Sequence, residues 1–170
     1  RDNDLYGAKS VIITSASSKT SIALGHTVTS GGHAKAIGLT SDRNLEFVKS
    51  LGCYDQVVTY DEVKSLPASE PVVMVDMAGN AQLKSTLHHQ FGDQMTYSCS
   101  VGATHWDATA GSTEEWPGAK PEFFFAPGQI AKRSQDWGPA GLQDRIGSAW
   151  TSFRDSTDAW LSVNRQYGRD

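Results

Sequence analysis

A run of hydroxylated side chains directly follows the first strongly apolar segment of the chain. Val11-Ile12-Ile13-Thr14 leads into Ser15-Ala16-Ser17-Ser18-Lys19-Thr20-Ser21, and a segment compatible with a helix comes next. In a strand, tight turn and helix of this kind, unpaired N–H groups and the positive end of the helix dipole meet at the turn, where a phosphate binds well. We therefore expect six residues to hold the pyrophosphate of a dinucleotide: Ser15, Ala16, Ser17, Ser18, Lys19 and Thr20.

This turn lacks the glycines of the common dinucleotide fingerprint. Hydroxyl side chains occupy space that glycine leaves open for the pyrophosphate, so an alternative stays open: the serines only cap a helix, and the nucleotide has been lost. Ser18-Lys19-Thr20 also imitates the end of a phosphate-binding P-loop. Ile13 and Ser18 stand where that motif needs its glycines, which argues against a P-loop.

The end of the second apolar segment bears on the choice of coenzyme. A carboxylate at this place would bind the adenosine ribose and favour NAD. The chain instead has Thr40, Ser41 and Arg43, whose hydroxyl groups and guanidinium suit a 2′-phosphate. We therefore predict NADP, with NAD as the less favoured coenzyme. An alternative for Asp42 stays open: this carboxylate only pairs with Arg43 or caps the helix that follows.

Strand and helix patterns alternate along the whole chain. Strands are expected over 11–14, 34–39, 56–60, 71–76, 94–101 and 122–126, and helices after the first strand and over 45–51, 81–91 and 142–163. This alternation predicts an α/β fold with a doubly wound parallel sheet of about six strands in the order 3-2-1-4-5-6. Ligands of such sheets bind at the carboxyl ends of the strands, near the switch point between strands one and four.

Several motifs carry a family resemblance. The spacing of Gly38-Leu39-Thr40-Ser41, Phe47-Val48-Lys49-Ser50-Leu51-Gly52 and Tyr54-Asp55-Gln56-Val57-Val58-Thr59-Tyr60 resembles the coenzyme-binding (Rossmann) half of medium-chain dehydrogenases/reductases, in particular the quinone oxidoreductase branch. Four further motifs look like an offshoot of that superfamily that carries only a domain-of-unknown-function label: Ser15-Ala16-Ser17-Ser18-Lys19-Thr20, Val75-Asp76-Met77-Ala78-Gly79-Asn80, Val101-Gly102-Ala103-Thr104-His105-Trp106 and Phe123-Phe124-Phe125-Ala126-Pro127.

The resemblance implies where a coenzyme would pass. It places Ala78 and Gly79 beside a ribose, and Val101 and Gly102 near the nicotinamide. Tyr60 ends the third expected strand, on the adenine side, where it could line an adenine pocket. An equally open interpretation is ordinary strand-to-helix turn chemistry, with Asp76 or Asn80 capping the helix that follows.

The resemblance also implies a function. It suggests an NADP(H)-binding domain that serves hydride transfer to a carbonyl, enone or quinone substrate. Members of the superfamily carry an N-terminal catalytic domain that has no counterpart in these 170 residues. We therefore expect a single dinucleotide-binding-type domain over 1–170, a fragment without catalytic residues that is inactive alone. A non-catalytic Rossmann scaffold or partner-binding module is the alternative.

Composition argues against other classes of partner. The net charge is −4 with scattered basic residues, so nucleic acid and anionic membranes are not expected as partners. The presence of only Cys53 and Cys99, with no Asn-x-Ser/Thr sequon, favours a cytoplasmic location. His88 and His89 are neighbours on a predicted helix and would point about 100° apart, so we expect no metal site there.

The expected sixth strand suggests a protein partner. Residues 122–126 contain three consecutive phenylalanines, which the two-residue alternation of a strand does not bury on a single face. At the edge of a sheet such a strand exposes an aromatic ring beside unpaired backbone groups. We expect a homodimer through this strand, or docking to the absent catalytic domain.

Overall fold

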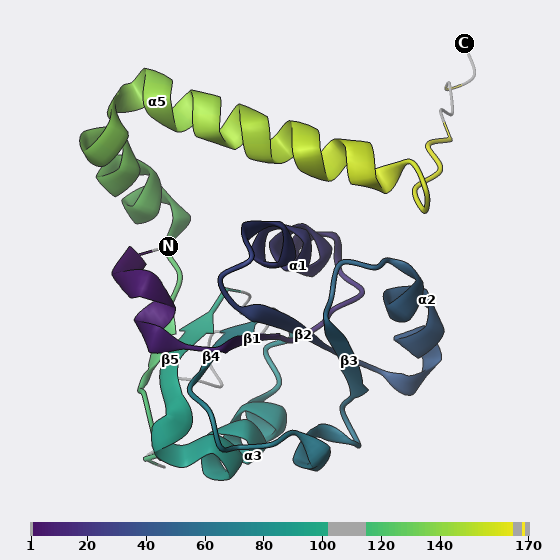
Figure 1. Cartoon of the computed structure of the whole chain (residues 1–170), viewed down its shortest axis with the longest axis vertical. Helices are drawn as coiled ribbons and strands as arrows, with labels where there is room; N and C mark the ends of the chain where they lie inside the picture. Colours follow the sequence, from purple (N-terminus) through teal and green to yellow (C-terminus); the bar gives the residue numbers. More distant parts are fainter. Residues whose placement is uncertain (1, 102–114, 165–167, 169–170) are drawn as a thin grey trace. The chain divides into compact units, whose positions relative to one another are not determined.

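Six parallel strands form one sheet in the described part of the chain, in the order β3-β2-β1-β4-β5-β6 (Figure 1). The computed structural model describes residues 2–101, 115–164 and 168. In chain order the strands are Ser10–Ile13 (β1), Lys35–Thr40 (β2), Gln56–Thr59 (β3), Val72–Asp76 (β4), Met95–Ser100 (β5) and Pro121–Phe123 (β6). The observed order confirms the predicted doubly wound α/β fold.

An α-helix lies between β1 and β2, between β2 and β3, and between β4 and β5. The sheet unit contains α1 (Lys19–Gly31), α2 (Leu45–Ser50) and α3 (Ala81–Phe91). Short 3-10 turns lie at Asp2–Gly7, Asp42–Asn44, Val63–Ser65 and Gly92–Gln94. All four residues of β1 are buried, as expected for a parallel strand that is covered on both faces.

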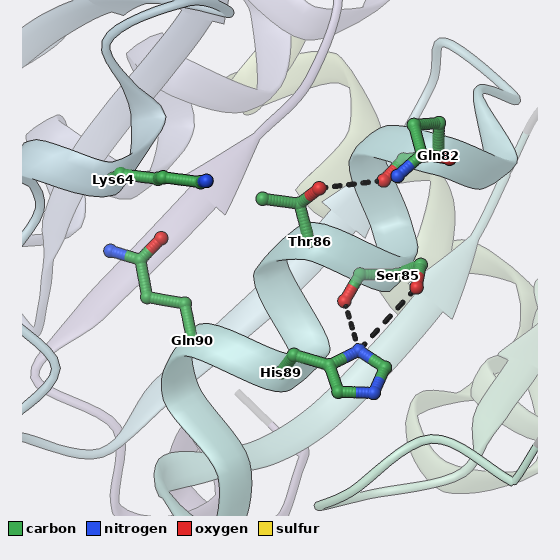
Figure 2. Close-up of a pocket in the computed structure, with 6 residues that line it drawn as sticks. All are labelled: Lys64, Gln82, Ser85, Thr86, His89 and Gln90. Atoms are coloured by element: carbon green, nitrogen blue, oxygen red, sulfur yellow. Dashed lines mark hydrogen bonds between the residues drawn. The ribbon is translucent and has the colours of Figure 1, made fainter.

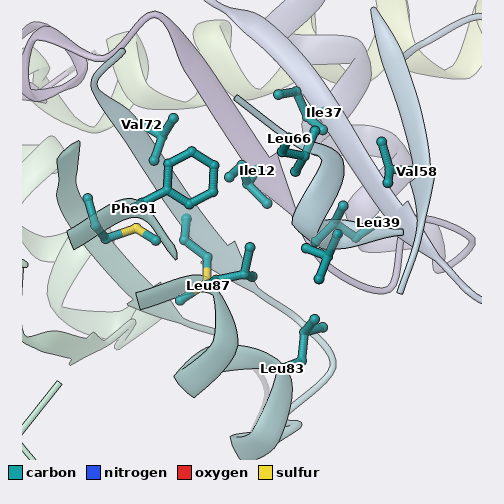
Figure 3. Close-up of a cluster of buried hydrophobic side chains, with 12 residues drawn as sticks. Ile12, Ile37, Leu39, Val58, Leu66, Val72, Leu83, Leu87 and Phe91 are labelled. Carbon is teal, nitrogen blue, oxygen red and sulfur yellow. The ribbon is translucent and has the colours of Figure 1, made fainter. Parts of the chain in front are cut away.

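Two apolar clusters hold the helices against the sheet. On one face, Leu87 and Phe91 of α3 pack with Ile12, Leu39 and Met74, and Figure 3 shows this cluster. On the other face, Val11, Ile13 and Val73 pack with Leu24 and Val28 of α1. Successive strand residues thus point to opposite faces, and α1 and α3 lie on opposite sides of the sheet (Figure 1).

The chain divides into two units, Arg1–Phe125 and Ala126–Asp170. The second unit contains α5 (Ala126–Thr157), which has non-helical backbone at Gly138, with φ 71° and ψ 158°, followed by Pro139. None of the helices in the described ranges is both long and apolar enough to cross a membrane. The expectation of one dinucleotide-binding-type domain over 1–170 stays a prediction.

The predictions for the last third of the chain need correction. The sixth strand ends at Phe123, rather than spanning 122–126, and the chain turns into α5 at Ala126. Pro127 lies in the first turn of that helix, where a missing backbone N–H costs nothing. The expected closing helix over 142–163 corresponds to the second helical segment of α5, which follows the break at Gly138 and ends at Thr157.

Candidate functional site

The turn after β1 lies at the carboxyl edge of the sheet, between the ends of β2 and β4. Ser15 has a φ of 53°, the left-handed conformation that glycine adopts most easily. The turn is closed by backbone hydrogen bonds from Ala16 N to Leu39 O (2.9 Å) and from Ser18 N to Ser15 O (2.8 Å). A serine thus occupies the backbone geometry for which the common fingerprint uses glycine.

The start of α1 keeps several hydrogen-bond donors available. Ser18 is the N-cap, and its Oγ accepts from Ser21 N at 3.2 Å. The amides of Ser17, Lys19 and Thr20 donate to no acceptor in the described part of the chain, and the side chains of Lys19 and Thr20 are exposed. Free amides and a lysine at a helix N-terminus are groups that bind phosphate in proteins.

Two tyrosines from around β3 support the turn. Tyr60 Oη accepts from Ser15 N at 3.2 Å, and Tyr54 Oη donates to Ala16 O at 3.0 Å. Burial is the main cause that raises the pKa of both phenols, so both stay protonated at neutral pH. Tyr60 is one of the predicted coenzyme residues, and the structure places it on this turn. Sequence reasoning missed Tyr54.

Two glycines make room for the Tyr54 ring. A Cβ on Gly25 of α1 would lie 2.6 Å from Tyr54 Cε1, and a Cβ on Gly38 of β2 would lie 3.0 Å from Tyr54 Cγ. A Cβ on Gly38 would also lie 3.0 Å from the Ala16 Cβ. Glycine is therefore required beside the turn, where neighbouring groups approach closely, although the turn itself has none.

The predicted 2′-phosphate residues lie close to the same turn. Asn44 Nδ2 donates to Ser17 Oγ at 3.1 Å, which joins the segment after β2 to the turn after β1. Arg43 is exposed and, among the described residues, makes no ion pair, so it does not pair with Asp42. Ser41 is half-buried, whereas Thr40 is only 1% exposed and its Oγ1 has no described hydrogen-bond partner.

A buried carboxylate organises the turn after β4. Asp76 Oδ1 accepts from Thr14 Oγ1 (2.8 Å) and from the amides of Ala78 and Gly79 (both 3.1 Å). Thr14 Oγ1 in turn accepts from Met77 N (2.8 Å) and Ala78 N (3.0 Å). The predicted ribose residues Ala78 and Gly79 are thus fixed against the end of β1.

A lysine that sequence reasoning missed completes this network. Lys84 Nζ lies 3.4 Å from Asp76 Oδ2 and donates to Ser100 Oγ at 3.2 Å, and both charged side chains are almost fully buried. Its spacing in the sequence could have indicated this burial. Lys84 precedes Leu87 and Phe91 by three and seven residues, which places it on the face of α3 that packs on the sheet.

The end of β5 joins the same edge through its backbone. Val101 N donates to Asp76 O at 2.9 Å, so Val101, predicted near the nicotinamide, lies beside the turn after β4. Gly102, predicted with it, lies outside the described residues. Sheet topology therefore brings predicted residues at the ends of five strands, β1 to β5, to one edge.

The histidines of α3 point in different directions. His88 is fully buried, with Nε2 3.0 Å from Ser98 Oγ and Nδ1 3.0 Å from Pro117 O, whereas His89 is exposed. The described residues contain no group of three side chains that could hold a metal.

Neither cysteine is placed for nucleophilic chemistry. Both are buried, and burial raises the pKa of the Cys53 thiol to about 11 and also raises the pKa of Cys99.

A pocket of about 530 Å³ lies away from these residues (Figure 2). It is formed by the outer side of α3 and by Lys64, and it contains none of the predicted coenzyme residues. Several of its side chains are already engaged: Thr86 Oγ1 donates to Gln82 O at 2.9 Å, and His89 Nδ1 contacts Ser85 O at 2.8 Å.

Solved structures share this fold. A protein assigned as an NADPH:quinone reductase, from Mesorhizobium loti, matches with a TM-score of 0.63 and 15% identity, over 93% of this chain and 46% of its own. The quinone oxidoreductase from Coxiella burnetii matches with a TM-score of 0.55 and 14% identity, over 91% of this chain and 44% of its own. The yhdH oxidoreductase from Salmonella enterica, solved in complex with NADP, matches with a TM-score of 0.48 and 16% identity. The match covers 89% of this chain and 44% of that structure's chain.

These matches confirm the predicted Rossmann-like fold. The chain spans less than half the length of these structures. It matches none of the curated proteins with which it was compared. A family model matches residues 1–170, over the whole length, and the chain therefore belongs to the family described as "Protein of unknown function (DUF2855)".

Proposed function

We propose that this chain is an NADP(H)-binding domain that serves hydride transfer to a carbonyl, enone or quinone substrate. One observation carries the proposal: at the switch point of a 3-2-1-4-5-6 sheet, the N-terminus of α1 presents three amides that donate to no acceptor among the described residues, beside an exposed lysine. This is the place and the chemistry that a pyrophosphate needs.

The choice of NADP over NAD is supported by the segment after β2. Arg43 is exposed and free of Asp42, and no carboxylate takes the place that binds a ribose in NAD-specific domains. The fold neighbour assigned as an NADPH:quinone reductase is consistent with this choice. In this proposal Ser41 and Arg43 hold the 2′-phosphate, and the buried Thr40 supports the segment after β2 from the protein interior.

A second candidate function is a Rossmann scaffold without a nucleotide. It is favoured by the internal bonds of the serine turn: Ser17 Oγ accepts from Asn44, Ser18 Oγ donates to Ser21 Oγ, and Ser15 N donates to Tyr60. These groups have hydrogen-bond partners within the protein, whereas the amides of Ser17, Lys19 and Thr20 have none in the described part of the chain.

A fluorescence titration separates the two candidates. Binding should quench the tryptophan emission of the chain, because reduced nicotinamide absorbs in that range, and NADPH should saturate at a lower concentration than NADH. Equal affinity for both would contradict the proposed role of Arg43. Absence of saturable quenching by either coenzyme, checked by calorimetry, would favour the scaffold.

A further inference from the structure

A charged pair lies in the protein interior below the proposed coenzyme edge. Asp76 and Lys84 have side-chain exposures of 0% and 4%, and the Lys84 ammonium stands 3.4 Å from Asp76 Oδ2. Desolvation makes such a pair expensive, and hydrophobic residues of similar size often stabilise a fold equally well. A pair of this kind therefore calls for a role beyond general stability.

The two carboxylate oxygens of Asp76 have different partners. Oδ1 is used fully by Thr14 Oγ1 and by the amides of Ala78 and Gly79. Oδ2 makes no hydrogen bond in the described part of the chain, so its counterion is the Lys84 ammonium. Lys84 thus balances the charge of the group that shapes the turn after β4.

The other contact of Lys84 reaches the next strand. Its Nζ donates to Ser100 Oγ at 3.2 Å, in the last residue of β5, and Asp76 pairs with Ser100 in the sheet register. The backbone amide of Val101 then donates to Asp76 O. One ammonium group therefore lies between the turn after β4 and the end of β5, which are the two segments proposed to contact the nicotinamide half of the coenzyme.

We propose that Lys84 is a positioning residue of the coenzyme site, which fixes the turn at 77–79 and the end of β5 through Asp76 and Ser100. The inference rests on the proposed function for its ligand. Lys84 itself does not touch the coenzyme, because its side chain is buried beneath the edge.

The test compares three variants of the full chain with a matched control. Lys84→Met and Asp76→Asn each break the ion pair, and the double variant leaves no unpaired charge inside the fold. Leu87→Ala is the control, since Leu87 is fully buried three residues further along α3 and belongs to the apolar cluster. Urea unfolding measures stability, NADPH titration measures affinity, and hydrogen exchange by NMR follows the amides at 77–79.

Lys84→Met should raise the Kd for NADPH by about tenfold, equivalent to about 1.4 kcal/mol, and should accelerate exchange at 77–79. In the double variant the effects should not add, because both substitutions break the same pair. Leu87→Ala should lose stability and keep its affinity. An affinity loss as large in Leu87→Ala, additive effects, or unchanged exchange at 77–79 would overturn the inference.

The design also separates this inference from the proposed function. If the wild-type chain does not bind NADPH, the proposed function fails. The exchange measurement then still decides the role of Lys84: faster exchange confined to 77–79 in Lys84→Met supports positioning of the turn, and unchanged exchange there refutes it.

Discussion

Replacing His88 should remove a pH dependence of stability that the fold creates. The imidazole is fully buried, and desolvation lowers its pKa from the usual 6.5, with the nearby charges of Lys84 and His89 acting in the same direction. Pro117 O can only accept, so Nδ1 donates to it and Nε2 accepts from the Ser98 hydroxyl. The folded chain therefore holds the neutral imidazole.

The sign follows from proton uptake. As pH falls below 6.5, the unfolded chain binds a proton at His88 that the folded chain does not bind, so the free energy of unfolding decreases. One proton of difference changes this free energy by about 1.4 kcal/mol per pH unit. Since the unfolded histidine is only half protonated at its pKa, the loss between about pH 6.5 and 5.5 reaches at most about 1 kcal/mol.

Urea unfolding near pH 7.5, 6.5 and 5.5 measures this loss. His88→Gln keeps an amide that can donate and accept but does not titrate, so its loss of stability on acidification should be smaller than that of the wild type. His89→Gln is the matched control, because this neighbour is exposed and should keep the wild-type pH dependence. If His88→Gln and the wild type lose the same stability, the buried imidazole is not the cause, and the reasoning fails.

Three further predictions concern the coenzyme and assembly. Arg43→Ala should weaken the binding of NADPH by about 1–3 kcal/mol, the scale of a charge-assisted hydrogen bond, and leave the binding of NADH nearly unchanged. Equal losses of affinity for both coenzymes would show that Arg43 has a structural role. The chain alone should show no steady NADPH oxidation with simple quinones or enones, because it spans less than half of the neighbouring structures; turnover by purified protein would contradict this. Sedimentation equilibrium should reveal a homodimer, because β6 lies at the edge of the sheet in the described part of the chain and Phe123, Phe124 and Phe125 are exposed. A monomer that Phe124→Lys does not alter would refute this prediction.

The fold was largely predictable because its signals are local. The strands β1 and β4 are short apolar runs, and Gly32 and Gly52 have positive φ after α1 and α2, where helix ends favour glycine. The error in the last third has a local cause as well. Pro127 and the Gly138-Pro139 pair interrupt the helical pattern of α5, although one lies in its first turn and the other at a break between two helical segments.

The site was predictable only in part, since several of its contacts link residues distant in sequence. Tyr54 and Tyr60 reach a turn 38 and 45 positions earlier, and Thr14 donates to a carboxylate 62 positions later. Sheet topology explains why the loops meet at one edge, but not which side chains cross between them. Lys84 was missed because a charged residue on a helix is usually solvated, and only its spacing places it on the buried face.

The turn without glycine shows how contacts from outside a loop can fix its conformation. A left-handed serine costs about 1 kcal/mol or more, so Ser15 keeps this geometry only because its surroundings hold it there. Tyr60 accepts from its amide, and Tyr54 holds the next carbonyl from a space that Gly25 and Gly38 leave open. The glycines needed here lie on α1 and β2, outside the turn. The absence of a glycine fingerprint therefore shows that the turn is built differently, and is not by itself evidence that a dinucleotide site has been lost.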